Sequence, residues 1–365
     1  MKPFIKRLPV SVSYRDDILL WGTDNLYPQR VEEVILASPI TKSAIQVQAD
    51  FINGDGFESD TQLGEYTANE LLNLISPDFS TYTCFAAILD VNLDGEIVDI
   101  YPVDVKYVRL GTPNKKGEIK TVKVNVDWEE QLPLNLRPKM LTYILWPGKD
   151  AAKQIIEDWD FESQGEFPGF CSFITPRKNQ YPLCTVDAVL DSSQSNAEIQ
   201  VFELAGIQNG FQSASVLKHQ GKIANEEERY RLMNLIDGVK GAENANSILL
   251  WEVPDGYEGE VLEQIPANDQ DKLFEQTNKA TVNRIVQSLA IPPALLGIMP
   301  ENSFFTMQEI TDSYNYFNVR TNRKRGVLSR ILNDIAKDFV TPAVLGNIKP
   351  QQFNAVQNAQ PNNTN

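Results

Sequence analysis

The sequence has few residues of the kinds that many enzymes and metal proteins need. Its 365 residues include a single histidine and only three cysteines, Cys84, Cys171 and Cys184. A Ser-His-Asp or Cys-His catalytic site, or a zinc site that includes histidine, would have to use His219. His219 lies in a strand-like stretch that ends in glycine, so we interpret it as an ordinary strand residue. An odd number of widely spaced cysteines indicates buried, reduced thiols.

The sequence also lacks long apolar runs and the short motifs of common active sites. No run of about 18 apolar residues occurs, so no membrane-spanning helix is predicted. The first residues lack the apolar stretch of a signal peptide, and none is expected. The spacings of phosphate loops, zinc proteases, redox cysteine pairs and nucleophile elbows are missing. We therefore predict no catalytic residue, no metal and no cofactor.

Two segments match ligand-binding motifs only in part. Residues 90–95 read D-V-N-L-D-G, which is the first half of a calcium loop. The twelfth position of such a loop should be glutamate but is Tyr101, and the flanks look like strands, which favours a hairpin turn. Residues 53–56 are glycine-rich but lack the spacing of a phosphate loop. We interpret them as a helix end followed by a turn.

The charge of the chain is strongly acidic and uneven. Acidic residues outnumber basic ones by 49 to 33, which gives a net charge of −16. Stable non-specific binding to DNA needs clustered lysine and arginine, so this balance argues against it. Residues 185–265 alone carry 14 acidic and 5 basic residues. This acidic block indicates a separate module with its own exposed surface.

Three charged clusters are candidate contact sites, and each has a plain structural alternative. An acidic run fits a partner or metal site, or a solvated helix start. A basic group in the last long helix fits phosphate contacts, or ion pairs with a neighbouring acidic surface. Two lysines seven residues apart share a helix face, which fits a contact site or a simply exposed face. These residues are Glu226, Glu227, Glu228, Arg320, Arg323, Lys324, Arg325, Lys272 and Lys279.

The first half of the chain has the pattern of one α+β domain over residues 1–184. Helical spacing from Pro28 stops at Ser38-Pro39, restarts, and ends at Asn53-Gly54. A short helix is predicted from Glu70 until Ser76-Pro77. Three strand-like stretches then follow, with turns at residues 94–95 and 116–117, and they predict a meander.

The second half alternates helices with a small strand-containing module. A helix is predicted from about Thr185 to residues 209–210, followed by a strand, a short acidic helix, a strand and a turn. A second helix spans Asp269–Ala290 and ends at two prolines. Ser303 is the predicted N-cap of a long helix that reaches Val340, with a bend at Gly326. The remaining residues are rich in Asn, Gln and Pro, which predicts disorder.

This order of segments resembles that of the portal proteins of tailed bacteriophages, of the HK97-like type. The sequence I-P-P-A-L-L-G at 291–297 follows the second helix, as the apolar-Pro-Pro-x-Leu-Leu-Gly motif does in that family. The segments W-G-T-D-N at 21–25 with Y-P at 27–28, S-P at 38–39 and I-N-G at 52–54 are similar to those of portal proteins from Bacteroidetes phages and prophages. The resemblance covers about residues 15–341, and the shared order is its stronger part.

The resemblance implies an α+β portal fold and a ring at one capsid vertex, usually of twelve subunits. DNA would pass through the ring in packaging and ejection. The implied partners are further copies of the chain, the large subunit of terminase, a head-tail adaptor or neck protein, the major capsid protein and double-stranded DNA in transit, with no membrane. The implied location is the virion, after assembly in the bacterial host cytoplasm.

The resemblance also divides the chain into parts. The division is an α/β wing at 1–184, a first stem helix at 185–208, a small α/β clip at 209–265, a second stem helix at 266–290, a tunnel loop at 291–303, a long kinked wing helix at 304–341 and a disordered tail at 342–365. The tunnel loop would present Pro300, Glu301, Asn302 and Ser303 to DNA. Lys272 and Lys279 would form basic rings in the stem, and Glu226 to Glu228 would be docking residues of the clip. The basic group at 320–325 would make contacts between subunits or with phosphates.

Two other classes of function stay open at this point. One is a different structural protein of a virion or a cell-envelope assembly that shares the long-helix plan. The other is an enzyme of unknown class, with calcium held by Asp90, Asn92 and Asp94. A closed ring of about a dozen chains favours the portal, and a monomer or dimer favours the enzyme.

Overall fold

The computed structural model describes most of the chain, in two compact units. Unit 1 consists of Met1–Asp191 and Ile285–Asn365, and unit 2 of Ser192–Arg284, so their boundary falls inside two helices. The described residues are 14–15, 17–129, 133, 136–177, 180–208, 215–220, 226–227, 230, 234, 248–253, 262–264, 270–299 and 304–353. Within them, only the backbone is described at 14–15, 205–208, 215–220, 248–253, 262–264 and 270–274.

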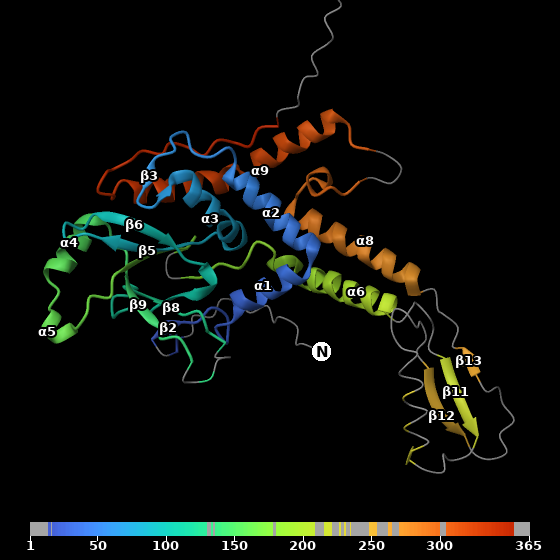
Figure 1. Ribbon diagram of the computed structural model, residues 1–365. Coiled ribbons are helices and arrows are strands. Elements are labelled where there is room, and N and C mark those ends of the chain that lie inside the picture. Colours follow the sequence, from blue (N-terminus) through green and yellow to red (C-terminus); the bar gives the residue numbers. More distant parts are fainter. Residues whose placement is uncertain are drawn as a thin grey trace, which may run out of the picture. The chain divides into compact units, whose positions relative to one another are not determined.

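Unit 1 is built on a six-stranded sheet with the order β6-β5-β10-β9-β8-β7 (Figure 1). Its strands are β5 (Phe85–Val91), β6 (Ile97–Pro102), β7 (Val108–Leu110), β8 (Thr121–Val124), β9 (Leu141–Leu145) and β10 (Phe170–Ile174). All neighbours are antiparallel except β9 and β10. Two short hairpins add β1 (Tyr14–Arg15) with β2 (Ile18–Leu19), and β3 (Gln62–Leu63) with β4 (Tyr66–Thr67).

The predicted meander is therefore only partly correct. The β5–β6 hairpin and the β7–β8–β9 run are confirmed, but β10 inserts between β5 and β9. Parallel strands need a crossover connection. Here the chain leaves β9, forms α4 (Lys149–Glu157) and α5 (Phe161–Gln164), and returns as β10.

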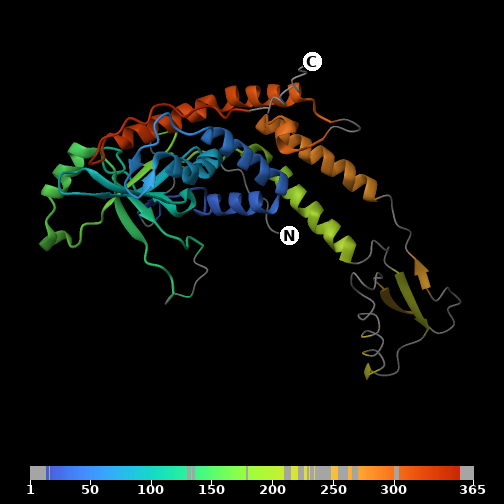
Figure 2. The ribbon, with the colours of Figure 1, turned by 45° about the horizontal axis from the view of Figure 1, so that its top comes forward.

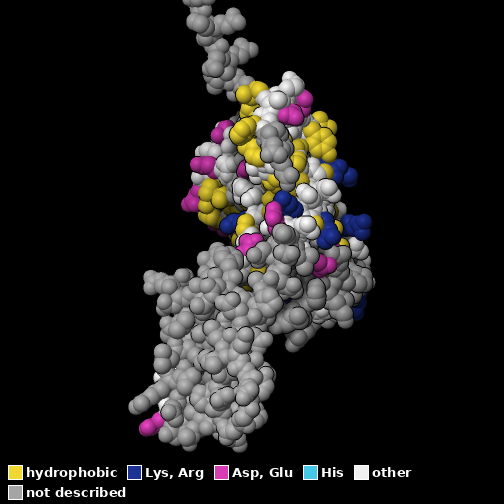
Figure 3. Space-filling view, turned by 90° about the vertical axis from the view of Figure 1, so that its right-hand side faces the viewer, with side chains coloured by type: hydrophobic (Ala, Val, Ile, Leu, Met, Phe, Trp, Pro, Cys, Tyr) yellow, Lys and Arg dark blue, Asp and Glu magenta, His cyan; other side chains and the backbone are white. Residues whose placement is uncertain are grey.

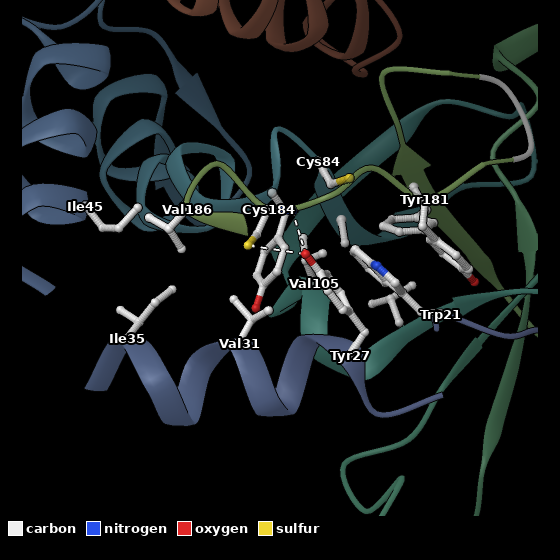
Figure 4. Close-up of a cluster of buried hydrophobic side chains, with 14 of the residues drawn as sticks. Trp21, Tyr27, Val31, Ile35, Ile45, Cys84, Val105, Tyr181, Cys184 and Val186 are labelled. Atoms are coloured by element: carbon white, nitrogen blue, oxygen red, sulfur yellow. Dashed lines mark hydrogen bonds between the residues drawn. The ribbon is translucent and has the colours of Figure 1, made fainter. Parts of the chain in front are cut away.

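The sheet is buried on both faces at β5 and β10, and β5 shows why. Because successive side chains of a strand point to opposite faces, Cys84 and Ala86 enter one core while Phe85 and Ala87 enter the other. The first core contains Trp21, Tyr27 and the helix α1, as Figure 4 shows. The second core contains side chains of α3, α9 and the C-terminal segment, such as Leu345.

The first two helices begin and end where the sequence predicts. They are α1 (Tyr27–Ala37) and α2 (Pro39–Asn53). Pro28 and Pro39 occupy first-turn positions, where the missing N–H costs nothing. The Ser38 hydroxyl caps α2 by accepting the Thr41 N–H at 3.4 Å.

The third helix is longer than the sequence predicts. α3 (Ala68–Tyr82) runs through Pro77, so the predicted stop at Ser76-Pro77 is wrong. Proline frees the carbonyl four residues earlier. The Ser76 hydroxyl donates to that carbonyl, of Asn73, at 3.5 Å. Burial of Leu71, Leu72 and Phe79 supplies the tertiary packing that overrides the break.

The long helix near the C-terminus is α9 (Met307–Ala336), and Figures 1 and 2 show it crossing α2. Its N-cap is Thr306, whose hydroxyl accepts the Glu309 N–H while the Glu309 carboxylate accepts the Thr306 N–H. This capping box replaces the predicted cap, Ser303, which lies outside the described residues. Gly326 is helical, so the predicted bend does not interrupt α9.

The sequence predicts a disordered tail from residue 342, but the segment that follows α9 is packed in the core of unit 1. Ala343, Leu345 and Ile348 are buried in the second core. The Lys349 N–H donates to the Gly56 carbonyl at 2.8 Å, which ties the segment to the end of α2. The packed part reaches Phe353, and residues 354–365 lie outside the description.

Unit 2 contains most of two helices and a small sheet. The helices are α6 (Leu190–Gln208) and α8 (Gln270–Leu289), which confirm the two predicted helices. The sheet has the order β12-β11-β13, with strands Ile248–Val253, Ser215–Gln220 and Leu262–Gln264. Among the described residues of both units, short 3₁₀ helices lie at Val105–Tyr107, Asp187–Val189 and Pro293–Leu296 (η1 to η3). In the described part, no helix has both the length and the hydropathy needed to cross a bilayer.

Candidate functional site

The W-G-T-D-N segment is held by a buried arginine. Arg109 of β7 is fully buried, and its five N–H donors are all used. Nε donates to Asn25 Oδ1 at 2.6 Å, and the two terminal nitrogens donate to Gln29 Oε1 and to three backbone carbonyls. The guanidinium also lies over the rings of Trp21 and Trp128. Burial lowers the pKa of Arg109 to about 10. The segment is thus an internal anchor of unit 1.

Tyr27 connects α1 to the segment that leads into α6. Its hydroxyl lies 2.7 Å from Asp187 Oδ1 and accepts the Cys184 N–H at 3.1 Å (Figure 4). Trp21 stacks on Tyr181 beside it, with ring centroids 4.4 Å apart. Burial raises the pKa of the Tyr27 hydroxyl and raises that of the Cys184 thiol to about 12. Both groups therefore stay protonated, and the cluster acts as a structural clamp on residues 181–187.

Lys324 joins four segments of unit 1. Its ammonium donates to Gln48 Oε1 of α2 at 3.1 Å, to the Ser80 carbonyl of α3 at 3.3 Å and to Thr185 Oγ1 at 3.2 Å. Thr185 in turn donates to Ser80 O. Burial, together with the nearby Arg320, lowers the pKa of Lys324 to about 8. This lysine junction fixes α9 against the segment that leads into α6.

Arg325 is also an internal residue. It is buried and donates to the Phe51 carbonyl at 2.7 Å and to Thr321 Oγ1 at 2.8 Å. The predicted role of Lys324 and Arg325 in contacts between subunits or with phosphates therefore conflicts with their positions. The sequence holds the signal, because Phe317, Thr321 and Arg325 follow at four-residue steps on the buried side of α9.

Arg320 and Arg323 are the members of the basic group that face solvent. Both are exposed, as is Arg330 further along α9. None of these three arginines forms an ion pair with another described residue. They remain available for contact with an acidic surface.

The helices α6 and α8 have faces of different character. Asn196 of α6 donates to Asn278 of α8 at 3.0 Å, and Ile199 and Thr281 are buried. Away from this contact, α6 exposes large apolar side chains. These are Val201, Phe202 and Leu204, which are 63%, 45% and 55% exposed.

On α8 the exposed side chains include the charged Glu275, Lys279 and Arg284, and the other exposed side chains carry no charge. Gln276, Ala280, Asn283 and Gln287 follow one side of the helix at helical spacing. We call these four residues the neutral stripe. Lys279, one of the predicted basic-ring residues, lies 3.1 Å from Glu275, so its charge is offset locally. The backbone of Lys272 is helical, and its side chain lies outside the description.

The other predicted site residues fall mainly outside the described residues. Glu226 and Glu227 are helical and exposed, whereas Glu228 is not described. The tunnel-loop residues Pro300 to Ser303 are likewise not described. The segment just before them contains η3, which ends at Gly297 with a φ of +69°.

The partial calcium motif forms the hairpin that the sequence favours. Asn92 Oδ1 accepts the N–H groups of Asp94 and Glu96 inside the β5–β6 turn. Asp94 lies 2.9 Å from Lys153, and Glu96 lies 2.8 Å from Lys149. Within the described residues, no group of three or more acidic, histidine or cysteine side chains is placed to hold a metal. These carboxylates serve to fix α4 to the hairpin.

A groove that sequence reasoning missed lies between α9 and the ends of β9 and β10. It has a volume of about 820 Å³. Trp146, Ile174, Val327 and Ile331 give it an apolar floor, and Arg323 and Arg330 lie along its α9 side. Its residues come from four distant parts of the sequence, so no local pattern marks it.

A second exposed apolar area lies near the beginning of α9. Phe304, Met307 and Val319 are 85%, 58% and 78% exposed. Figure 3 looks onto this end of the molecule and shows hydrophobic side chains, in yellow, gathered near the top. Exposed apolar patches of this kind mark interaction surfaces.

Comparison with known proteins supports a shared fold. No family model matches the chain. An uncharacterized protein of Rickettsia bellii (strain RML369-C) is 26% identical over 137 residues, which is 37% of this chain and 34% of that protein. The match thus spans about a third of that relative.

Solved structures match over nearly the whole length. A chain in the virion of the native gene transfer agent (GTA) particle is 14% identical, with a TM-score of 0.54 over 91% of this chain and 85% of that chain. A chain in the neck of the native GTA particle, computed with C12 symmetry, is 13% identical, with a TM-score of 0.51 over 89% and 84%. An HK97 family phage portal protein from Corynebacterium diphtheriae is 10% identical, with a TM-score of 0.43 over 84% and 90%. The predicted α+β class is confirmed, and the chain shares its fold with a protein of the GTA particle neck.

Proposed function

We propose that this chain is a portal protein, which forms a ring at one capsid vertex and conducts DNA during packaging and ejection. The observation that carries the proposal is the fold, shared over 91% of the chain with a GTA virion protein. The order of sequence motifs up to I-P-P-A-L-L-G at 291–297 supports the same assignment. The protein then acts as a structural virion component rather than as an enzyme, in a closed ring of identical copies.

The apolar face of α6 supports the assembly of several copies. Val201, Phe202 and Leu204 are large and exposed in the single chain. Large apolar side chains that a helix exposes together mark a surface for interaction with another molecule. Packing α6 of one copy against the stem of the next would remove these side chains from water, at about 1.5–3 kcal/mol for each fully buried side chain.

The neutral stripe of α8 suits a channel for DNA. Amide side chains carry no net charge, so they form no strong ion pairs with phosphates. In a ring every residue is repeated in each copy, so one lysine per chain would become a ring of positive charge. The Lys279–Glu275 pair weakens this effect. Weak contacts of this kind permit sliding.

The remaining parts are assigned by the same proposal. Residues 1–184 form the wing together with α9, residues 209–265 form the clip, and residues 291–303 form the tunnel loop. The acidic clip, with Glu226 to Glu228, would dock the large terminase subunit and later the neck protein. Twelve is the ring number that we propose, and the virion is the location.

Electron microscopy of the purified protein, with native mass measurement, tests the proposal. We expect closed rings with a central hole, of about a dozen copies. Leu204→Asp should reduce rings to smaller species, because it places a charge in the contact between stems. Glu198→Gln, a change on the same helix that leaves the apolar side chains intact, is the matched control. A wild-type protein that stays monomeric at all concentrations would contradict the proposal.

A further inference from the structure

The groove between α9 and the sheet lacks an assigned role. Its floor is formed by half-buried apolar side chains, namely Trp146, Ile174, Val327 and Ile331. On its α9 side, Arg323 and Arg330 are seven residues apart and therefore share one side of the helix. Neither is ion-paired within the described residues. The carboxylates that also line the groove have other cations nearby, since Asp334 lies 2.7 Å from Lys337 and Lys149 lies near Asp338.

The same unit carries a projection with the opposite charge. Residues 157–166, which include α5, contain five carboxylates and no basic residue. We call this segment the acidic tip. At its centre Phe161 is 64% exposed, although a phenylalanine side chain is strongly apolar. The tip thus combines an apolar anchor with a negative rim, and the groove combines an apolar floor with a positive rim.

The acidic tip is held in one conformation. Trp159 donates its indole N–H to the Gly165 carbonyl at 3.1 Å, and Asp160 caps α5 through the Glu162 N–H at 3.0 Å. A row of edge-to-face rings then links the tip to the sheet. The centroid distances are 5.1 Å for Trp159–Phe167, 5.3 Å for Phe167–Phe170 and 5.3 Å for Trp146–Phe170. A preorganised tip loses little conformational entropy when it binds.

We propose that the acidic tip of one copy docks in the groove of the next copy, with Phe161 on the apolar floor and the carboxylates beside Arg323 and Arg330. The two patches have no residue in common, so each copy can use both at once with two neighbours. Contacts of this head-to-tail type generate rings. The inference rests on the proposed ring, for which it supplies a contact in the wing, and charge complementarity sets its register.

Charge reversal tests the electrostatic part of the contact. Arg323→Glu with Arg330→Glu should raise the concentration needed for assembly at least tenfold. Adding Asp158→Lys and Glu162→Lys to the same chain should restore assembly, because the signs are then exchanged across the contact. These two tip residues are chosen since neither caps α5. Lys115→Glu with Lys116→Glu, an equal charge change in an exposed turn, is the control and should assemble as the wild type does.

Cross-linking tests the contact directly. Cys84, Cys171 and Cys184 are buried, so introduced thiols react selectively. A chain with Phe161→Cys and Val327→Cys, treated with a short bismaleimide, should give a ladder of covalent multimers up to the closed ring. Each single variant should give none, and a mixture of the two single variants should stop at dimers.

The outcomes separate the contact from the ring itself. Rings that form normally with Arg323→Glu and Arg330→Glu, and that yield no ladder from the double cysteine chain, would overturn the docking and leave the portal proposal intact. A ladder without closed rings would support the docking and contradict the portal proposal. A monomer without any ladder would overturn both.

Discussion

Buried cations without a carboxylate partner hold unit 1 together. Arg109, Lys324 and Arg325 direct their N–H groups to carbonyl, amide and hydroxyl oxygens of other segments. Arg109 and Lys324 use all their donors within the chain, and Arg325 uses both of its terminal nitrogens. Removal of any of the three therefore leaves several buried acceptors unsatisfied. The consequence is that these residues act on stability, while Arg320 and Arg323 remain for contacts with other molecules.

Because Lys324 is buried, we expect the free energy of unfolding to depend on pH. The folded pKa of Lys324 is lowered to about 8, whereas an unfolded lysine titrates near 10.4. Below pH 8 the folded state carries the full cost of the buried charge. As pH rises from 8 toward 10.4, the folded state loses this proton first, so the free energy of unfolding rises.

Urea unfolding at pH 7.5 and 9.5 checks this effect. The stability of the wild type relative to Lys324→Met should increase by about 1–2 kcal/mol between the two pH values. The comparison with Lys324→Met cancels the opposing titration of buried tyrosines and cysteines. A difference between the two proteins that does not change with pH would contradict the junction.

A substitution at Gly54 is expected to lower stability through a steric clash. It ends α2 with a φ of +56°, and a Cβ there would overlap the Lys349 carbonyl oxygen. Gly117 has a φ of +79° and open space around it, so it is a matched control for backbone strain alone. Gly54→Ala should cost about 2 kcal/mol more than Gly117→Ala in thermal or urea unfolding, because the clash adds to the strain. Equal costs would mean that the C-terminal segment does not pack on α2.

For the helices, the sequence predicts an end correctly only where the residue that would cap or stop the helix does so in the folded protein. The limits of α1 and α2 were predictable because Ser38 and the two first-turn prolines act on adjacent residues. Pro77 misled the prediction, since packing of α3 compensates for one lost hydrogen bond. Ser303 and Thr306 are equally good caps by residue type, and only the structure shows that the capping box is Thr306–Glu309.

The cap of α9 gives a prediction for this element. Thr306→Ala should lower the free energy of unfolding by about 1 kcal/mol, because it leaves a first-turn N–H without its acceptor. Ser303→Ala tests the residue that sequence alone would choose and should have little effect. Hydrogen exchange in the first turn of α9 would show the same contrast. A larger loss from Ser303→Ala would mean that the helix begins earlier.

For the whole molecule, the order of helices and strands could be predicted from the sequence, but the surfaces that form where distant segments meet could not. The pattern of helical and strand-like segments predicted the α+β class and the two helices α6 and α8. The groove was not predictable, because Trp146, Ile174 and Val327 meet only through the parallel pairing of β9 and β10 and the crossing of α9. The inward positions of Lys324 and Arg325 were not predictable for a similar reason, since neighbouring positions on a helix face different partners.

We propose that copies of the chain pack side by side around a channel, with α6 between neighbours and the neutral stripe of α8 toward the hole. A cryo-electron microscopy map of the assembled protein at side-chain resolution tests this packing. We expect a closed ring in which Val201 and Leu204 are buried against the adjacent copy, while Gln276, Asn283 and Gln287 line the lumen. A map that shows no through-going hole, or α6 apolar side chains facing solvent and the neutral stripe buried between copies, would contradict it.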